Sequence, residues 1–154
     1  MLLAEFLDFD AIRPGLSGGN KRSLLQQLAN LAAQRLEIPP ADVLASLTER
    51  EQLGSTGLGQ GVAIPHGKIE GLDRIYGLFA RLAEPVDYKA IDGRPVDLVF
   101  LLLSPPEAGA DHLKALAVIS RITRHAATLE RMRGARSRDA LAAVLMSADE
   151  RDAA

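Results

Sequence analysis

The sequence contains no cysteine, no excess of positive charge and no long apolar run. Without cysteine, a disulfide framework, a thiolate zinc site and a cysteine nucleophile are all excluded. The absence of cysteine is also compatible with a reducing compartment. The net charge of −2 gives no electrostatic reason to expect binding to nucleic acid or to an anionic membrane. The longest wholly apolar runs, residues 98–103 and 140–146, are far too short to span a bilayer.

The start of the chain also lacks the features of a secretory signal. No positive charge precedes its apolar residues, and the acidic residues Glu5 and Asp8 interrupt them. We therefore expect a cytoplasmic protein with no membrane-inserted segment. The length of 154 residues favours a single domain, and a chain of this size buries roughly 70% of the surface that it exposes when unfolded.

Helical patterns occupy most of the first third of the chain. Apolar residues recur there at three- and four-residue steps, and they predict one helix after Asn20, the expected N-cap. A second helix is predicted over about residues 41–53, and Gly54 is its expected C-cap. In the leading segment before Asn20, we expect a short helical turn near residues 3–7 and an extended stretch over residues 10–16.

Helical patterns return in the last third of the chain. They predict a helix from about Asp111, the expected N-cap, to Ala126, a shorter one that ends at Gly134, and a last one that Ser137 caps. Residues 148–154 are expected to fray. This third is rich in arginine, which usually indicates a solvated helical face, although a docking surface for an acidic partner is the alternative. The arginines are Arg121, Arg124, Arg131, Arg133, Arg136 and Arg138.

Three strands are predicted between these helical regions, over residues 62–64, 75–82 and 97–104. The last of them holds six consecutive apolar residues, which is typical of a central strand that is buried on both faces. Residues 84–95 contain two prolines and a glycine and are expected to form a long connection. Helices before and after the strands favour an α/β fold with a mixed β-sheet flanked by helices on both faces.

A glycine-rich segment, residues 54–68, separates the second predicted helix from the strands. Four of its first eight residues are glycine, and such density is costly in backbone entropy unless the loop has a special task. One such task is to hold an anion close to main-chain N–H groups. For the hydroxyl groups of Ser55 and Thr56, hydrogen bonding at the helix end and in the turn is as good an explanation as binding an anion. The candidate phosphate-binding residues are Ser55, Thr56, Gly57, Gly59 and Gly61.

This loop does not match the known nucleotide-binding patterns. The P-loop pattern would need a glycine where Val62 precedes Gly67 and Lys68, and a serine or threonine where Ile69 follows. The dinucleotide pattern Gly-x-Gly-x-x-Gly also fails, because its third glycine falls on Val62 or on Ile64. The sequence therefore disfavours a nucleotide site.

His66 is the strongest candidate for chemistry in this segment. It follows a predicted strand and Pro65, and it precedes Gly67. A neutral imidazole is a good nucleophile for a phosphoryl group near pH 7, provided that a hydrogen bond at its other nitrogen fixes the tautomer. The alternative is a structural loop histidine, which is the more common role of a histidine in a loop.

Two further residues are candidates to complete a phosphoryl site. Arg50 lies near the end of the second predicted helix, and its planar guanidinium suits phosphate oxygens, although it also complements the helix dipole there. His112 lies in the first turn of the third main helix and is a candidate second imidazole, or else a partly buried structural residue. His125 is interpreted as a surface residue. A zinc site usually shows two ligands at close spacing in the sequence, and neither His66 nor His112 belongs to such a pair, so no metal site is expected.

Several short motifs stand in a characteristic order. They are Thr-Glu-Arg-Glu at residues 48–51, Gly-Ser-Thr-Gly-Leu-Gly at 54–59, Gly-Val-Ala-Ile-Pro-His-Gly-Lys at 61–68, Gly-Arg-Pro-Val-Asp-Leu-Val-Phe at 93–100 and Asp-His-Leu at 111–113. Together they resemble the enzyme IIA domains of the fructose–mannitol class of the bacterial phosphotransferase system. Within that class they resemble the nitrogen-regulatory IIA proteins most. The resemblance covers about residues 10–147, so we expect the chain, residues 1–154, to form one IIA domain with this core.

The resemblance implies both a fold and a function. It implies a mixed β-sheet flanked by helices, and a phosphoryl group that a histidine-containing phosphocarrier protein donates to His66. It implies that Nε2 of His66 is the acceptor atom, that a hydrogen bond orients its Nδ1, and that Arg50 and His112 line the site. The implied transfer needs no metal and no organic cofactor.

The branch within this class decides where the phosphoryl group goes next. In sugar-specific members it moves on to a IIB domain, whereas in the nitrogen-regulatory branch the phosphorylation state signals to partners such as potassium transport systems or sensor kinases. The chain ends soon after its last predicted helix and has no cysteine for a IIB phosphocysteine site, which favours the regulatory branch. The alternatives are a sugar-uptake IIA component with a separate IIB partner, and a regulator whose histidine has lost its role.

Overall fold

A mixed β-sheet with helices on both faces makes up the structure, a computed structural model that describes residues 1–154. Its strands are β1 (Arg13–Leu16), β2 (Gly57–Gly59), β3 (Val62–Ala63), β4 (His66–Lys68), β5 (Tyr76–Val86) and β6 (Val96–Ser104). Its helices are α1 (Lys21–Leu36), α2 (Pro40–Gln52), α3 (Ala110–Thr123), α4 (Ala126–Gly134) and α5 (Arg138–Ala153). Two 3₁₀ turns, Leu3–Glu5 and Phe9–Ala11, precede β1.

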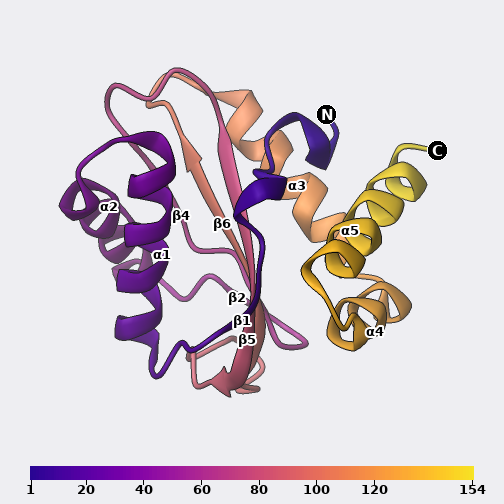
Figure 1. Cartoon of the computed structure of the whole chain (residues 1–154). Helices are drawn as coiled ribbons and strands as arrows, with labels where there is room; N and C mark the ends of the chain where they lie inside the picture. The colour runs from indigo at the N-terminus through magenta and orange to yellow at the C-terminus, as the bar shows by residue number, and fades with distance from the viewer.

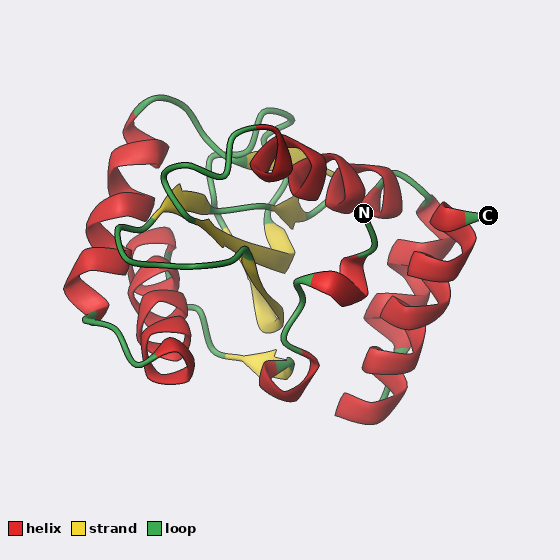
Figure 2. Ribbon diagram, turned by 90° about the horizontal axis from the view of Figure 1, so that it is seen from above, coloured by secondary structure: helices red, strands yellow, loops and turns green.

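The sheet contains six strands in the order β1-β5-β6-β3-β2, and β4 pairs with β6 beyond the end of β3. The β5–β6 and β2–β3 pairs are antiparallel, whereas β1–β5, β3–β6 and β4–β6 are parallel. Helices α1 and α2 cover one face, α3, α4 and α5 cover the other (Figure 1), and the same layers are seen from above in Figure 2. The predicted α/β class, with a mixed sheet flanked on both faces, is confirmed.

Strand β6 is the centre of both halves of the core. Its side chains alternate between the two faces, as the period of a strand requires. Val99, Leu101 and Leu103 belong to the cluster on the α1–α2 face, whereas Leu98, Phe100 and Leu102 belong to the cluster on the α3–α5 face. All six are fully buried, so the predicted strand with two buried faces is confirmed. Burial of one such side chain stabilises a fold by about 1.5–3 kcal/mol.

Local sequence signals placed several helix ends correctly. The side chain of Asn20 accepts a hydrogen bond from the amide of Ser23, and that of Ser137 accepts one from Ala140, so both predicted N-caps are confirmed. Helix α2 ends one residue before its predicted end, and Leu53 rather than Gly54 occupies its C-cap position. Gly54 follows with a φ of 146°. A glycine tolerates this left-handed backbone because it has no Cβ.

Two predictions about helix α3 were wrong. Helix α3 begins at Ala110, and Gly109 rather than Asp111 occupies its N-cap position. It ends at Thr123 rather than Ala126, because the backbone at His125 is extended and begins a new helix.

The chain end does not fray as predicted, because α5 continues to Ala153. The reason is a contact with the other terminus. The buried carboxylate of Asp149 accepts hydrogen bonds from the amides of Leu3 and Ala4, with N–O distances of 2.7 and 3.0 Å. These bonds fix the predicted N-terminal turn against the last helix.

Three strand predictions also needed correction. The expected connection over residues 84–95 begins later, because β5 continues through Pro85 to Val86, which pairs with Val96. The register shifts between Arg81 and Val86, and such an irregular stretch tolerates a residue without an amide hydrogen. Strands β2 and β4 were not predicted, since each has three residues and contains glycine. In the leading segment, only residues 13–16 of the stretch predicted as extended form a strand.

No helix has both the length and the apolar composition that a membrane span requires.

Gly67 allows α2 to approach β4 closely. A Cβ atom at this position would overlap the Oγ of Ser46, whose hydroxyl donates a 3.0 Å hydrogen bond to the carbonyl of Lys68. This approach places the end of α2, which carries Arg50, beside the strand that carries His66.

We predict that Gly67→Ala lowers the free energy of unfolding by about 1–3 kcal/mol, because the added methyl group overpacks the contact between α2 and β4. Urea unfolding measures this change. Gly15→Ala is the matched control, since Gly15 also lies in a strand and nothing lies within 4 Å of a Cβ placed there. Its effect should stay within about 0.5 kcal/mol. Equal losses in the two variants would contradict the close approach.

Candidate functional site

His66 is the first residue of β4, and no strand pairs with β4 on its far side. Its imidazole is half-buried, and Nδ1 lies 2.7 Å from the carbonyl oxygen of Ile64. A carbonyl only accepts hydrogen bonds, so Nδ1 carries the proton and Nε2 keeps its lone pair. The hydrogen bond that the sequence led us to expect at Nδ1 is therefore present.

Arg50 approaches the other nitrogen of this imidazole from the last turn of α2. Its Nε donates to Nε2 of His66 over 3.2 Å, and its Nη1 donates to the carbonyl of Gly54 over 2.9 Å. The remaining terminal nitrogen, Nη2, has no hydrogen-bond partner within the chain. The guanidinium is thus held at two points and retains free N–H groups beside the imidazole.

His112 lies in the first turn of α3 and approaches His66 from the face of the sheet opposite to α2. Its side chain is buried, and its ring centroid lies 5.5 Å from that of His66 with a 52° angle between the ring planes. Its Nδ1 lies 2.6 Å from the hydroxyl oxygen of Ser104 at the end of β6. The structure therefore brings together the three residues that the sequence singled out first, His66, Arg50 and His112.

The surroundings keep both imidazoles neutral. Burial lowers the pKa of His66 below its usual value of 6.5, and the positive charge of Arg50 lowers it further, against the hydrogen bond to Ile64. Burial also lowers the pKa of His112, and the charges of His66 and Lys68 act in the same direction. Near pH 7 the Nε2 lone pair of His66 is therefore available for attack on an electrophile.

The glycine-rich loop is held mainly by contacts to the protein interior. The amide of Gly57 donates to the hydroxyl of Ser55, and that hydroxyl donates to the carbonyl of Tyr88. Thr56 gives both its amide and its hydroxyl hydrogen to the carboxylate of Glu51. These partners fit the local hydrogen bonding that was the equal alternative for Ser55 and Thr56, and a phosphate contact of Ser55, Thr56 and Gly57 stays a prediction.

Gly59 and Gly61 lie away from the imidazole, in the hairpin that joins β2 and β3. Residue 62 pairs with Leu98 of β6, whereas His66 pairs with Leu102, four positions further along. At about 3.3 Å per residue, this separation is roughly 13 Å. The expectation that these two glycines bind the same phosphate is therefore corrected. They are needed instead for positive φ angles of 101° and 80° in a tight turn.

Comparison with known proteins identifies the family of this chain. Residues 5–148 match the family model described as "Phosphoenolpyruvate-dependent sugar phosphotransferase system, EIIA 2". The chain belongs to this EIIA family. The family that the sequence motifs indicated is therefore confirmed.

Similar members of the EIIA family include nitrogen regulatory proteins. The chain is 47% identical over 145 residues to the nitrogen regulatory protein of Bradyrhizobium diazoefficiens, with coverage of 94% of this chain and 95% of the relative. The crystal structure of the nitrogen regulatory protein IIA-Ntr from Neisseria meningitidis superposes with a TM-score of 0.87 at 37% identity, covering 93% of this chain and 98% of that one.

A sugar-specific EIIA protein is also similar. The fructose-specific EIIA component of Haloferax volcanii is 35% identical over 126 residues, which cover 81% of this chain and 82% of the relative. Sequence similarity alone thus connects the chain with both branches of the EIIA family, and the higher identity is with a nitrogen regulatory protein.

Sequence reasoning did not single out Glu51, which fixes the loop that precedes His66. Its carboxylate lies 2.8 Å from Nζ of Lys21 and accepts hydrogen bonds from Thr56 and from the hydroxyl of Tyr88. Burial alone would raise the pKa of Glu51, but the hydrogen bonds from Lys21 and Thr56 hold it below its ordinary value. Its position directly after Arg50 was the available signal. Its partners lie up to 37 residues away, so spacing could not reveal them.

Ser104 was also missed as a partner of the site. It ends a run of six apolar residues in β6, and its hydroxyl contacts His112 across the α3–α5 face. A polar residue at the end of a buried strand was a signal, but only the fold shows which side chain it meets. No group of three or more histidine, aspartate or glutamate side chains gathers in a geometry that could hold a metal ion.

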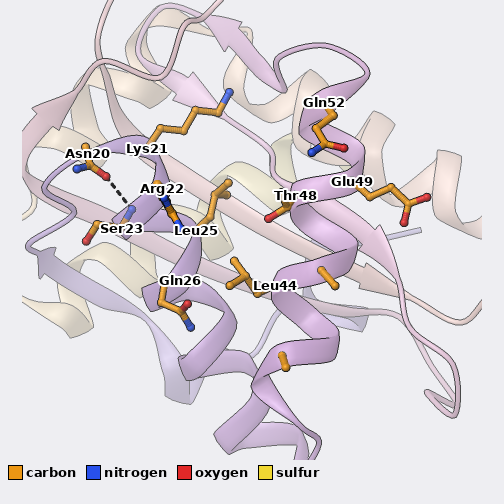
Figure 3. Close-up of a pocket in the computed structure, with 12 residues that line it drawn as sticks. Asn20, Lys21, Arg22, Ser23, Leu25, Gln26, Leu44, Thr48, Glu49 and Gln52 are labelled. Atoms are coloured by element: carbon orange, nitrogen blue, oxygen red, sulfur yellow. Dashed lines mark hydrogen bonds between the residues drawn. The ribbon is translucent and has the colours of Figure 1, made fainter.

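A groove of about 1180 Å³ lies elsewhere, between α1 and α2 (Figure 3). His66 does not line it. Asn20 caps α1 at one end of the groove, and Lys21 extends from its edge to reach Glu51. The lining residues are Asn20, Lys21, Arg22, Ser23, Leu25, Gln26, Ala41, Leu44, Ala45, Thr48, Glu49 and Gln52.

We predict that two cations act separately on the two imidazoles. Arg50→Gln should raise the pKa of His66, because a neighbouring positive charge is removed, whereas Lys68→Gln should raise the pKa of His112. In the unchanged protein both imidazoles should titrate below 6.5. NMR titration of the histidine ring nitrogens measures all of these values. If Lys68→Gln moved the pKa of His66 and Arg50→Gln did not, the arrangement described here would be wrong.

Proposed function

We propose that the chain is a cytoplasmic phosphohistidine relay of the nitrogen-regulatory phosphotransferase system. In this proposal, Nε2 of His66 accepts a phosphoryl group from a histidine-containing phosphocarrier protein. The observation that carries the proposal is the arrangement of the imidazole. A carbonyl holds its Nδ1 proton, so its lone pair lies on the nitrogen that faces Arg50.

The transfer moves one phosphoryl group between two imidazoles. The Nε2 lone pair of His66 attacks phosphorus, a new N–P bond forms, and the N–P bond to the donor histidine breaks with its electron pair returning to the donor. Positive charge develops on the His66 ring as Nε2 is substituted. The carbonyl of Ile64, which accepts the Nδ1 hydrogen, stabilises that charge. Because the donor supplies the phosphoryl group, this chemistry requires no organic cofactor and no metal.

Arg50 and His112 supply the remaining electrostatic stabilisation. As Nε2 is phosphorylated, the Arg50 Nε–H loses its acceptor and turns to a phosphoryl oxygen, and the free Nη2 donates to another. His112 is close enough to offer a further donor from the opposite face. Loss of one such preorganised donor typically slows a reaction by about 10²–10³. The loop residues Ser55, Thr56 and Gly57 contribute by fixing the loop around this site.

We further propose that the phosphorylation state is the signal that the protein gives. The similarity to nitrogen regulatory proteins supports a regulatory output. The output partners expected from the resemblance are potassium transport systems or sensor kinases. These partners would distinguish the phosphorylated from the unphosphorylated form of the surface around His66. Phosphorylation adds about 1.5–2 negative charges at pH 7 and three acceptor oxygens, so the surface around His66 would change its preferred partners.

Phosphorylation of purified variants tests the relay. After incubation with the phosphodonor proteins, mass spectrometry should find one acid-labile phosphate on the unchanged protein and none on His66→Ala. His125→Ala is the matched control and should be phosphorylated normally, because His125 is exposed at the start of α4 and away from the site. Arg50→Gln should be phosphorylated about 10²–10³ times more slowly. Uptake of phosphate by His66→Ala would refute the assignment.

The second candidate function is a sugar-uptake EIIA component. The similarity to a fructose-specific EIIA component favours testing it. The phosphorylated protein would be mixed with a fructose- or mannitol-type IIB domain and its sugar. We predict that the phosphate stays on His66 under these conditions. Rapid, sugar-dependent loss of phosphate to IIB would support the sugar-uptake function and would overturn the regulatory one.

A further inference from the structure

Ser104 is out of place in the pattern of β6. By strand alternation it shares a face with Phe100 and Leu102, whose side chains pack in the apolar core beneath α3 and α5. Its own exposure is 0%, although its hydroxyl is polar. A buried hydroxyl group is costly unless it is hydrogen-bonded, so its partner should explain why the strand ends in serine.

The only hydrogen-bond partner of this hydroxyl is Nδ1 of His112, at 2.6 Å. The direction of the bond follows from what each group can donate. If Nδ1 carried the proton and donated it, the hydroxyl hydrogen of Ser104 would be buried without an acceptor. If Ser104 donates, both the hydroxyl group and Nδ1 of His112 are satisfied. Nδ1 then holds the lone pair, and the ring proton resides on Nε2.

We infer that Ser104 is a positioning residue that fixes His112 in the Nε2–H tautomer, so that this imidazole donates a hydrogen bond to the phosphoryl group on His66. The inference rests on the function proposed above. It gives the two imidazoles opposite tautomers for opposite tasks. The carbonyl of Ile64 leaves a lone pair on Nε2 of His66, and the hydroxyl of Ser104 leaves an N–H on Nε2 of His112.

This division of roles fits the chemistry of the transfer. A phosphoryl group presents three oxygens that only accept hydrogen bonds, and the lone pair of the other tautomer would repel them. With rings 5.5 Å apart, an oxygen on the phosphorus at His66 comes within reach of His112. Arg50 and His112 then approach the group from opposite faces of the sheet.

The experiment compares Ser104→Thr with Ser104→Val. Threonine and valine have nearly the same shape. Threonine adds one methyl group to serine and retains the hydroxyl, whereas valine adds the same methyl group and replaces the hydroxyl with a second one. The ¹⁵N shifts of the His112 ring should show the Nε2–H tautomer in the unchanged protein and in Ser104→Thr, and a mixture of tautomers in Ser104→Val. Phosphoryl transfer to His66 should be about tenfold slower in Ser104→Val than in Ser104→Thr, the order expected for one hydrogen bond.

Two results would overturn the inference. One is a proton on Nδ1 of His112 in the unchanged protein, and the other is the same tautomer and transfer rate in both variants. Matched backbone amide spectra of the two variants exclude a difference in folding as the cause. If the unchanged protein took no phosphate on His66, the proposed function would fail with the donor role. A retained Nε2–H tautomer would then show that Ser104 still orients the ring, so the two failures are distinguishable.

Discussion

The hydrogen bond from Nδ1 of His66 to the carbonyl of Ile64 determines what the rest of the site can do. An imidazole that is free to exchange its proton between nitrogens presents a lone pair at Nε2 to an incoming electrophile only part of the time. The bond removes that ambiguity at 2.7 Å. Its geometry depends on Pro65, which restricts the backbone between the two partners, and on β4, which begins at His66 itself.

The edge of the sheet is what allows groups from both faces to meet. An imidazole in the middle of the sheet would project to one face only, whereas β4 has β6 on one side and no strand on the other. Arg50 on α2 therefore reaches the His66 ring from one face, and His112 on α3 lies beside that ring on the other, although the two helices belong to different layers. Glu51 adds rigidity, because it joins the end of α2 to the loop that precedes the site.

The sequence predicted the features that depend on neighbouring residues and on the family motif. Asn20 and Ser137 cap their own helices, and the apolar run of β6 requires two covered faces, so each was recognisable locally. For the hydroxyls of Ser55 and Thr56 the sequence left two roles open, a phosphate contact or local hydrogen bonding, because spacing along the loop does not show that Tyr88 and Glu51 offer them acceptors. The same limit applies to Ser104 and His112: their contact is local in sequence, but a turn and the start of α3 determine it.

The bond between the two chain ends has a consequence for how this protein is made. Asp149 is separated from its donors, the amides of Leu3 and Ala4, by 146 and 145 positions. During synthesis those amides emerge from the ribosome about 145 residues before their acceptor. These two hydrogen bonds therefore form only after every strand and helices α1 to α4 have been translated, so α5 secures the N-terminal turn late in folding.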